Sequence, residues 1–153
     1  MAALNPVFQS ESERIHSDHQ EMLHELATLD LALEHMGSGT ADMTDLHCVV
    51  KARAITLAIS RRLPELFMRE ESRLFKTVAE VSHELSLFVE EMKREHIVLF
   101  SMVNSFCVAL DELANASDLQ AAVVNLKELG MDVSRALRHH FTAEEHELQG
   151  FLR

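Results

Sequence analysis

The chain has 153 residues, 47 % of them hydrophobic, with only four Gly and two Pro to interrupt helices, so we expect one α-helical domain over residues 1–153. The formal net charge of −11 argues against nucleic acid and anionic membranes as partners, because phosphate binding requires a basic face. The sequence lacks a signal peptide, an apolar run long enough to cross a bilayer and a CxxC pair, and this combination predicts a cytoplasmic protein.

The first predicted helix begins at a capping box formed by Ser10 and Glu13. It ends at the Gly-Ser-Gly run of residues 37–39, because glycine is favoured just after a helix. Alternating steps of three and four residues predict the face that points to the core. That face carries Ser12, Ile15, His19, Met22, Leu26, Leu29 and Leu33.

The second predicted helix is capped by Thr40 or Asp42 and extends to about Glu80. Its apolar periodicity is noisier than that of the first helix. The residues expected on its core face are Ile55, Ile59, Leu63, Leu66, Glu70 and Leu74.

The third predicted helix is capped by Ser82 and extends to about Ala114, and a capping box of Ser117 and Gln120 opens the fourth. The core face of the third helix carries Leu85, Val89, Met92, His96, Leu99, Val103, Phe106, Leu110 and Leu113. The core face of the fourth carries Leu119, Val123, Leu126, Gly130, Val133, Leu137, His140 and Glu144. Short connections between four long helices predict an all-α, antiparallel up-down-up-down four-helix bundle.

Five ionisable side chains interrupt these core faces: His19, Glu70, His96, His140 and Glu144. An isolated charge is costly to bury unless it is paired or bound to a metal. Counted from the helix ends at about 1.5 Å per residue, all five fall at one height in an antiparallel bundle. Imidazole and carboxylate groups suit iron, copper or zinc, and carboxylates on facing helices can bridge two ions. The pattern therefore predicts a buried transition-metal site.

Other histidines fall off the core faces and are expected at the surface: His24, His35, His47, His83 and His146. Glu71 and Glu145 directly follow two candidate ligands, and we expect them at the surface or supporting those ligands from behind.

The two halves of the chain repeat the same pattern. Asp18-His19 in the first half corresponds to Glu95-His96 in the second, and residues 66–71 (LFMREE) correspond to residues 140–145 (HFTAEE). This arrangement resembles the hemerythrin-like family, especially its HHE cation-binding branch, in which a His and an HFxxEE segment occur twice. The resemblance covers nearly the whole chain and implies a non-haem di-iron centre. The residues that match five of the six usual ligands of that centre are His19, Glu70, His96, His140 and Glu144.

The sequence departs from the family pattern at Leu66, where the family has its remaining histidine. An open coordination position could then take water, O2 or NO, the site could hold one metal ion, or His16 or Glu65 could replace the missing ligand. Apolar side chains should surround the site and exclude bulky ligands. Those side chains are Leu66, Met22, Met92 and Leu99.

These observations predict a protein with one or two non-haem iron ions that binds or senses O2 or NO, or handles iron under oxidative or nitrosative stress. A second hypothesis, supported by Leu66, is a metal-poor bundle that acts as a regulatory or protein-interaction module. A ferritin-like site would use Glu-x-x-His, and haem would require no buried glutamates such as Glu70 and Glu144. No nucleophile–base pair or phosphate-binding loop is visible, so an enzyme is not the favoured interpretation. The sequence leaves the oligomeric state and any protein partner open.

Overall fold

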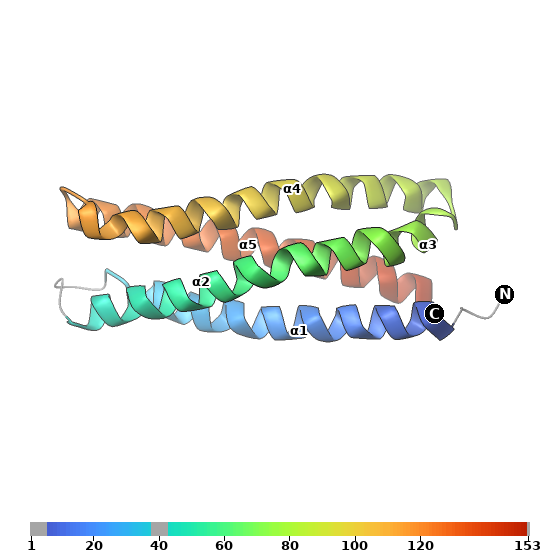
Figure 1. Ribbon diagram of the computed structural model, residues 1–153, viewed down its shortest axis with the longest axis horizontal. Coiled ribbons are helices and arrows are strands. Elements are labelled where there is room, and N and C mark those ends of the chain that lie inside the picture. The colour runs from blue at the N-terminus through green and yellow to red at the C-terminus, as the bar shows by residue number, and fades with distance from the viewer. Residues whose placement is uncertain (1–5, 38–42, 153) are drawn as a thin grey trace.

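The computed structural model describes residues 6–37 and 43–152, except the side chains of residues 8, 43–45 and 149–152. Its helices form an antiparallel up-down-up-down bundle, as the sequence predicts (Figure 1). The long helices are α1 (Pro6–His35), α2 (Met43–Arg69), α4 (His83–Glu112) and α5 (Leu119–Leu152). The start of α1 and the end of α5 lie at the same end of the bundle (Figure 1).

The second of the four helical rods of the bundle consists of α2 and the two short helices that continue it, over residues 43–79. It contains a π-helical turn that the sequence did not predict. After α2 come the π-helix η1 (Glu70–Leu74) and the short helix α3 (Phe75–Ala79). A π turn holds more residues than an α turn, so the core face shifts and Leu74 and Phe75 are both buried. This shift explains the noisy periodicity of the rod. It also places the candidate ligand Glu70 at the start of the irregular turn.

The N-termini of α4 and α5 test two predicted helix caps. Ser82 caps α4 as expected, because its side chain accepts a hydrogen bond of 3.1 Å from the backbone N–H of Leu85. The capping box of Ser117 and Gln120 is wrong. Asp118 caps α5 instead, accepting a bond of 3.1 Å from the N–H of Ala121. An aspartate beside a serine is an equally good cap, and here it sits directly before the helix.

The first helix begins earlier than predicted, at Pro6 rather than at the capping box of Ser10 and Glu13. Proline suits the first turn of a helix, because its missing N–H would have no intrahelical partner there. Gly37 follows the end of α1 with a φ of 75°, which confirms the predicted glycine terminator. The short 3-10 helix η2 (Leu113–Asn115) follows α4 near the predicted end. Ser38, Gly39, Thr40 and Asp42 lie outside the described residues.

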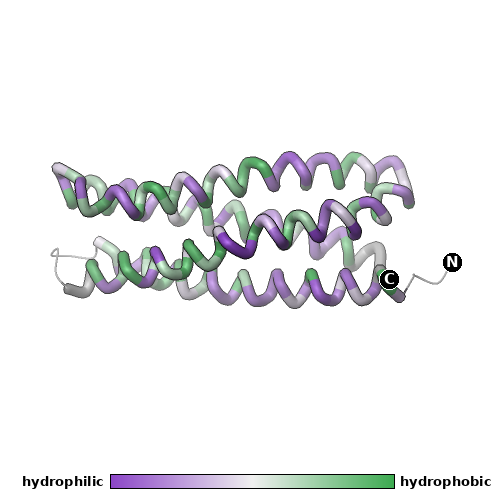
Figure 2. The backbone as a smooth tube through the Cα atoms, in the orientation of Figure 1, coloured by the Kyte–Doolittle hydropathy of each residue, from purple (hydrophilic) through white to green (hydrophobic). Residues whose placement is uncertain are grey.

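The core is built mainly from the predicted apolar faces, and hydrophobic and hydrophilic positions alternate along the helices (Figure 2). The prediction is wrong for Leu119, which is 46 % exposed at the first position of α5. Gly130 marks a tight point between α1, α4 and α5. A Cβ at this position would lie 2.8 Å from the ring of Phe106 and 2.9 Å from Leu33. The close packing of these helices therefore depends on the missing side chain.

One helical segment, His83–Asn115, is long and apolar enough to cross a membrane by length and composition, and its most apolar 18 residues have a mean hydropathy of 1.7. The expectation that no apolar run approaches this length does not hold for this segment. Its helix α4 packs against α2, α3 and α5 and carries the buried His96. Its apolar composition also includes an outer face, on which Ile97 is 73 % exposed and Val98 is 57 % exposed.

Candidate metal centre

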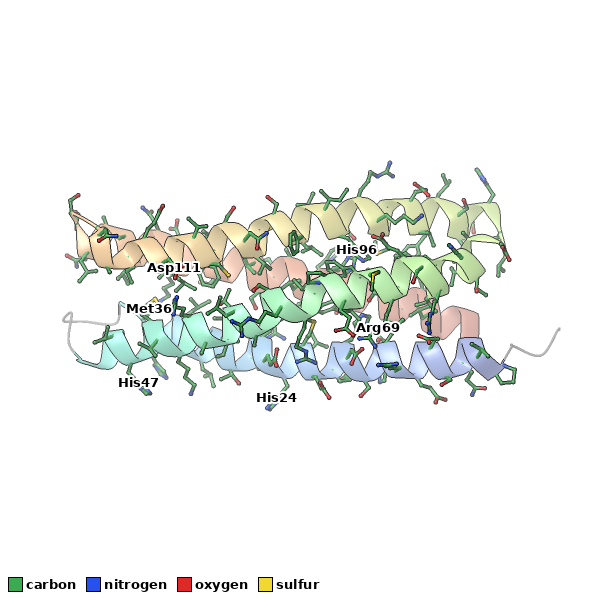
Figure 3. All side chains as sticks on the ribbon, in the orientation of Figure 1. His24, Met36, His47, Arg69, His96 and Asp111 are labelled. Atoms are coloured by element: carbon green, nitrogen blue, oxygen red, sulfur yellow. The ribbon has the colours of Figure 1, made fainter. Side chains whose placement is uncertain are left out.

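The structure brings all five predicted ligand side chains together inside the bundle. They come from every long rod: α1, the π turn η1, α4 and α5. Figure 3 shows His96 within the bundle, whereas His24 and His47 point away from it. All five side chains are buried, with exposed fractions of 0 % for His19, Glu70 and Glu144, 1 % for His140 and 3 % for His96. The histidines expected at the surface are exposed, as predicted: His24, His35, His47, His83 and His146.

Glu70 lies between two imidazoles from opposite sides of the bundle. Its Oε1 atom is 2.9 Å from His19 Nε2 and forms a hydrogen bond with it. Its Oε2 atom is 3.0 Å from His96 Nε2, but without the alignment of a hydrogen bond. A carboxylate that presents one oxygen to each of two imidazoles has the arrangement of a bridging ligand.

Glu144 faces the same centre from α5. Its Oε2 atom lies 3.4 Å from His140 Nε2 and 3.8 Å from His19 Nε2. Several buried atoms of the cluster have no hydrogen-bond partner: Glu70 Oε2, His96 Nε2, His140 Nε2 and both carboxylate oxygens of Glu144. Buried polar atoms are rarely left unpaired, because losing their water contacts costs free energy. Nitrogen and oxygen atoms from four of these side chains lie within 4.8 Å of one another, so the donor set fits a transition-metal cation.

Each imidazole of the cluster is held from behind by a carboxylate. The Nδ1–oxygen distances are 2.8 Å for His19 and Glu145, 2.7 Å for His96 and Glu71, and 3.0 Å for His140 and Glu95. Because an ionised carboxylate only accepts hydrogen bonds, each Nδ1 donates, and Nε2 is left to face the centre. This is the support that metal-binding histidines usually have.

Sequence reasoning anticipated a supporting position for Glu71 and Glu145 but assigned no role to Glu95. The internal repeat contained a signal for it, because an acidic residue precedes the histidine in both halves. Two phenylalanines of the repeat were also missed as site residues. The ring of Phe67 stacks on His96 at 3.8 Å, and the ring of Phe141 stacks on His19 at 4.7 Å.

The two central glutamates differ in charge preference. Burial acts to raise the pKa of Glu70, but the hydrogen bond from His19 and the close approach of His96 outweigh it and lower this pKa to about 2. Burial and the nearby charge of Glu70 raise the pKa of Glu144 to about 7. Glu144 is therefore the carboxylate whose charge is least compensated by the protein.

The imidazoles supply the compensating charge when no cation is bound. Burial acts to lower the pKa of His19, but its bonds to Glu145 and Glu70 and the charge of Glu144 raise this pKa to about 10. The pKa of His140 is also raised, because contacts with Glu144 and Glu95 outweigh burial. A divalent cation would supply the same compensation in place of these protons.

Leu66 is buried beside the cluster and offers no ligand atom. It lines a cavity of about 50 Å3 together with Asp18, Met22, Arg62, Glu65 and Arg69. Asp18 occupies the place in α1 that Glu95 has in α4, but it bonds Arg69 at 2.7 Å instead of a histidine. A carboxylate that could support a histidine at position 66 is thus present in Asp18, but it pairs with Arg69.

Neither candidate replacement ligand reaches the buried cluster. His16 bonds the outer oxygen of Glu145 at 2.8 Å and is itself exposed. Glu65 is exposed and faces the cavity beside Leu66. The four apolar side chains expected around the site are all buried: Leu66, Met22, Met92 and Leu99.

Comparison with known families gives one finding. The model of the hemerythrin HHE cation binding domain matches residues 10–152. That range includes all five side chains of the buried cluster. Comparison with curated proteins and with solved structures gave no match.

Proposed function

Because the chain belongs to the hemerythrin HHE cation-binding family, we propose that its buried cluster binds non-haem iron and, through iron, a small diatomic molecule such as O2 or NO. One observation carries this proposal. Three imidazoles are fixed by carboxylates at Nδ1 and turn Nε2 toward two buried glutamates, several of whose atoms have no partner. Bound iron would supply reversible coordination of a ligand at an open position. Iron handling under oxidative or nitrosative stress is the second role we assign to the same site.

The two sides of the cluster differ in the number of ligands they offer. His96 and His140 share one side with Glu70 and Glu144, and this group forms a compact four-residue set. His19 has only the shared carboxylates beside it, since Leu66 contributes no ligand atom. We therefore propose one tightly held ion next to His96 and His140, and a weaker position next to His19.

The surroundings of the weaker position favour a small ligand. Leu66 and Met22 are each 2 % exposed and separate this side from bulk solvent. The cavity of about 50 Å3 that Leu66 and Met22 line has none of the five cluster side chains in its wall, so it adds no space at the ion. The residues of this half thus favour a diatomic ligand over a larger substrate.

Metal analysis of the purified protein tests the proposal. Protein from iron-replete cells, purified anaerobically, should contain about one to two iron ions per chain. The His140→Ala variant should lose this iron. The neighbouring His139→Ala variant is the matched control, because His139 is exposed and should retain it. NO added to the ferrous protein should produce new absorption bands only in the variants that hold iron.

A metal-poor regulatory or interaction module is the second candidate function. The ion pair between Asp18 and Arg69 favours it, because it occupies the carboxylate that a histidine at position 66 would use. This function would be supported if the folded protein contains no stoichiometric metal and if His140→Ala changes neither metal content nor helicity. Iron in the wild type that depends on His140 would reject it.

A further inference from the structure

The outer face of α4 carries an apolar strip that nothing in the described part of the chain covers. The groove along this face is lined by Ile97, Phe100, Ser101, Asn104, Ser105 and Val108. Ile97 is 73 % exposed and Val108 is 54 % exposed. Exposed apolar residues gathered on one helix face are typical of an interaction surface.

Charged residues of opposite sign close the two ends of the strip. Arg94 lies at one end and Glu112 at the other, and both are exposed. They are 18 residues apart, which is about five turns of α-helix, so they lie on the same face. Neither forms an ion pair with the described residues. Glu95 and Asp111 are the two acidic residues between them. Glu95 bonds His140, and Asp111 is paired with Arg53 of α2.

The strip has serine and then valine at equal distances on both sides of its middle, followed by an arginine on one side and a glutamate on the other. Steps of four and three residues place Arg94, Val98, Ser101, Ser105, Val108 and Glu112 along one line of the helix. Counted from position 103, serine faces serine, valine faces valine and arginine faces glutamate. An antiparallel copy of α4 would therefore meet this strip with matching small, apolar and opposite-charge positions. A parallel copy would place arginine on arginine.

We propose that this face of α4 pairs antiparallel with α4 of a second copy of the chain. The two helices cross near position 103, where the short side chains of Ser101 and Ser105 allow a close approach. Val98 of each copy then packs on Val108 of the other, and Arg94 pairs with Glu112 at both ends. Closed twofold pairing of this kind uses one surface twice and leaves no open end.

The size of the strip sets the expected strength. It is about 27 Å long on a helix about 10 Å wide, which is less area than the roughly 800 Å2 per partner of a stable complex. The two copies also carry a net charge of −11 each, which opposes association. We therefore expect a reversible dimer with a dissociation constant in the micromolar range or weaker.

Sedimentation equilibrium of the full chain over a range of concentrations, at fixed salt, tests the proposal. The wild type should form dimers, and Val108→Glu should raise the dissociation constant by more than about tenfold. Val124→Glu is the matched control, because Val124 on α5 is 52 % exposed and lies on another helix. It should leave the dissociation constant unchanged. Helicity and iron content should be equal in all three proteins.

Charge reversal tests the antiparallel register. Arg94→Glu and Glu112→Arg should each weaken the dimer, because like charges then meet at both ends. The double variant should restore wild-type association, since every pair is again of opposite sign. These exposed positions also keep the test valid if Val108→Glu fails to fold.

Four outcomes would overturn the proposal. The wild type could remain monomeric at the highest concentration, or dimers could form equally well in Val108→Glu. The double charge reversal could fail to restore association. Finally, the monomer could bind neutral phosphatidylcholine vesicles in a manner that Val108→Glu abolishes, which would assign the strip to a lipid surface instead.

Discussion

The two HFxxEE-like segments of this chain face each other across the bundle, and they differ at one decisive residue. In α5, His140 points at the cluster, and Glu95 holds it from behind. In the second rod, Leu66 stands in the corresponding place, and the corresponding carboxylate, Asp18, pairs with Arg69. The same fold thus builds a complete half-site and an incomplete one. The two halves therefore differ both in the residue that faces the cluster and in the partner of the carboxylate behind it.

The shared glutamates show the same asymmetry. Glu70 is approached by imidazoles at 2.9 Å and 3.0 Å. Glu144 has its nearest imidazoles at 3.4 Å and 3.8 Å, and both of its oxygens lack partners. Glu70 therefore has one oxygen hydrogen-bonded by the protein, whereas neither oxygen of Glu144 is, so Glu144 is the carboxylate that most needs a cation.

The largest expected effect on iron affinity separates two variants, each of which replaces one of the corresponding residues His140 and Leu66. His140→Ala should weaken binding of the tighter ion by at least about a hundredfold, because a direct ligand matters at least as much as its supporting partner. Leu66→Ala should keep the tighter ion but lower the free energy of unfolding by about 2–5 kcal/mol, since a buried leucine is truncated. Iron titration and chemical denaturation of both variants would measure this. Equal loss of iron in both would contradict the assignment of the complete half.

The supporting carboxylates should give the next largest effect. Glu95→Gln should reduce affinity for the tighter ion by about 10-fold to 100-fold, because His140 loses the acceptor that orients it. Asp18→Asn should leave that affinity unchanged, since Asp18 bonds Arg69 and no histidine. Competition with a chelator of known affinity would compare the two variants. A larger loss in Asp18→Asn would show that the pair with Arg69 supports the metal.

Completing the weaker half should have a smaller, opposite effect. Leu66→His alone should improve binding of a second ion only partly, because Asp18 is already paired with Arg69. Adding Arg69→Ala frees Asp18 and copies Ala143, the corresponding residue of α5. We expect the double variant to bind the second ion about tenfold more tightly than Leu66→His. If the two variants bind it equally, Asp18 does not support position 66.

The smallest predicted effect is a pH dependence of the metal-free protein. Glu144 has its pKa raised to about 7, so the stability it contributes is complete below its unfolded value and is lost as the pH rises through 7. His19, with a pKa raised to about 10, and His140, whose pKa is also raised, act in the same direction. The stability that each contributes decreases as the pH rises above the ordinary histidine pKa of 6.5. Glu70, with a pKa of about 2, stays ionised throughout this range.

Thermal unfolding at pH 5 and pH 8 measures this dependence. The metal-free protein should melt on the order of 5 °C lower at pH 8. The iron-loaded protein should change less, because the cation replaces the lost protons. Metal-free Glu144→Gln serves as the control and should show a reduced dependence. A metal-free wild type that is more stable at pH 8 than at pH 5 would contradict the charge assignment.

Much of this architecture follows from local rules. The apolar periodicity predicts the four rods, and the ionisable interruptions of that periodicity predict the five clustered side chains. Ser82 acts as a cap because its position before an apolar run leaves no competitor. Ser117 fails as a cap because Asp118 is adjacent and equally suited, and local rules do not rank the two.

The remaining features depend on tertiary contacts. The π turn at Glu70 places a carboxylate between two imidazoles on other helices. The noisier apolar periodicity of this rod is its trace in the sequence, but that noise does not identify a π turn. The pairing of Asp18 with Arg69 joins residues 51 positions apart. The role of Glu95 depends on how α4 is rotated against α5. Periodicity predicts which face is buried, but it does not predict which flanking residues meet.

Anaerobic titration of the metal-free protein with Fe(II), followed by calorimetry, tests the central claim most directly. We predict unequal binding, with one tight ion that disappears in His140→Ala and a weaker ion that Leu66→His with Arg69→Ala strengthens. Two ions of equal affinity, or no stoichiometric binding in a folded protein, would contradict the account of one complete and one incomplete half-site.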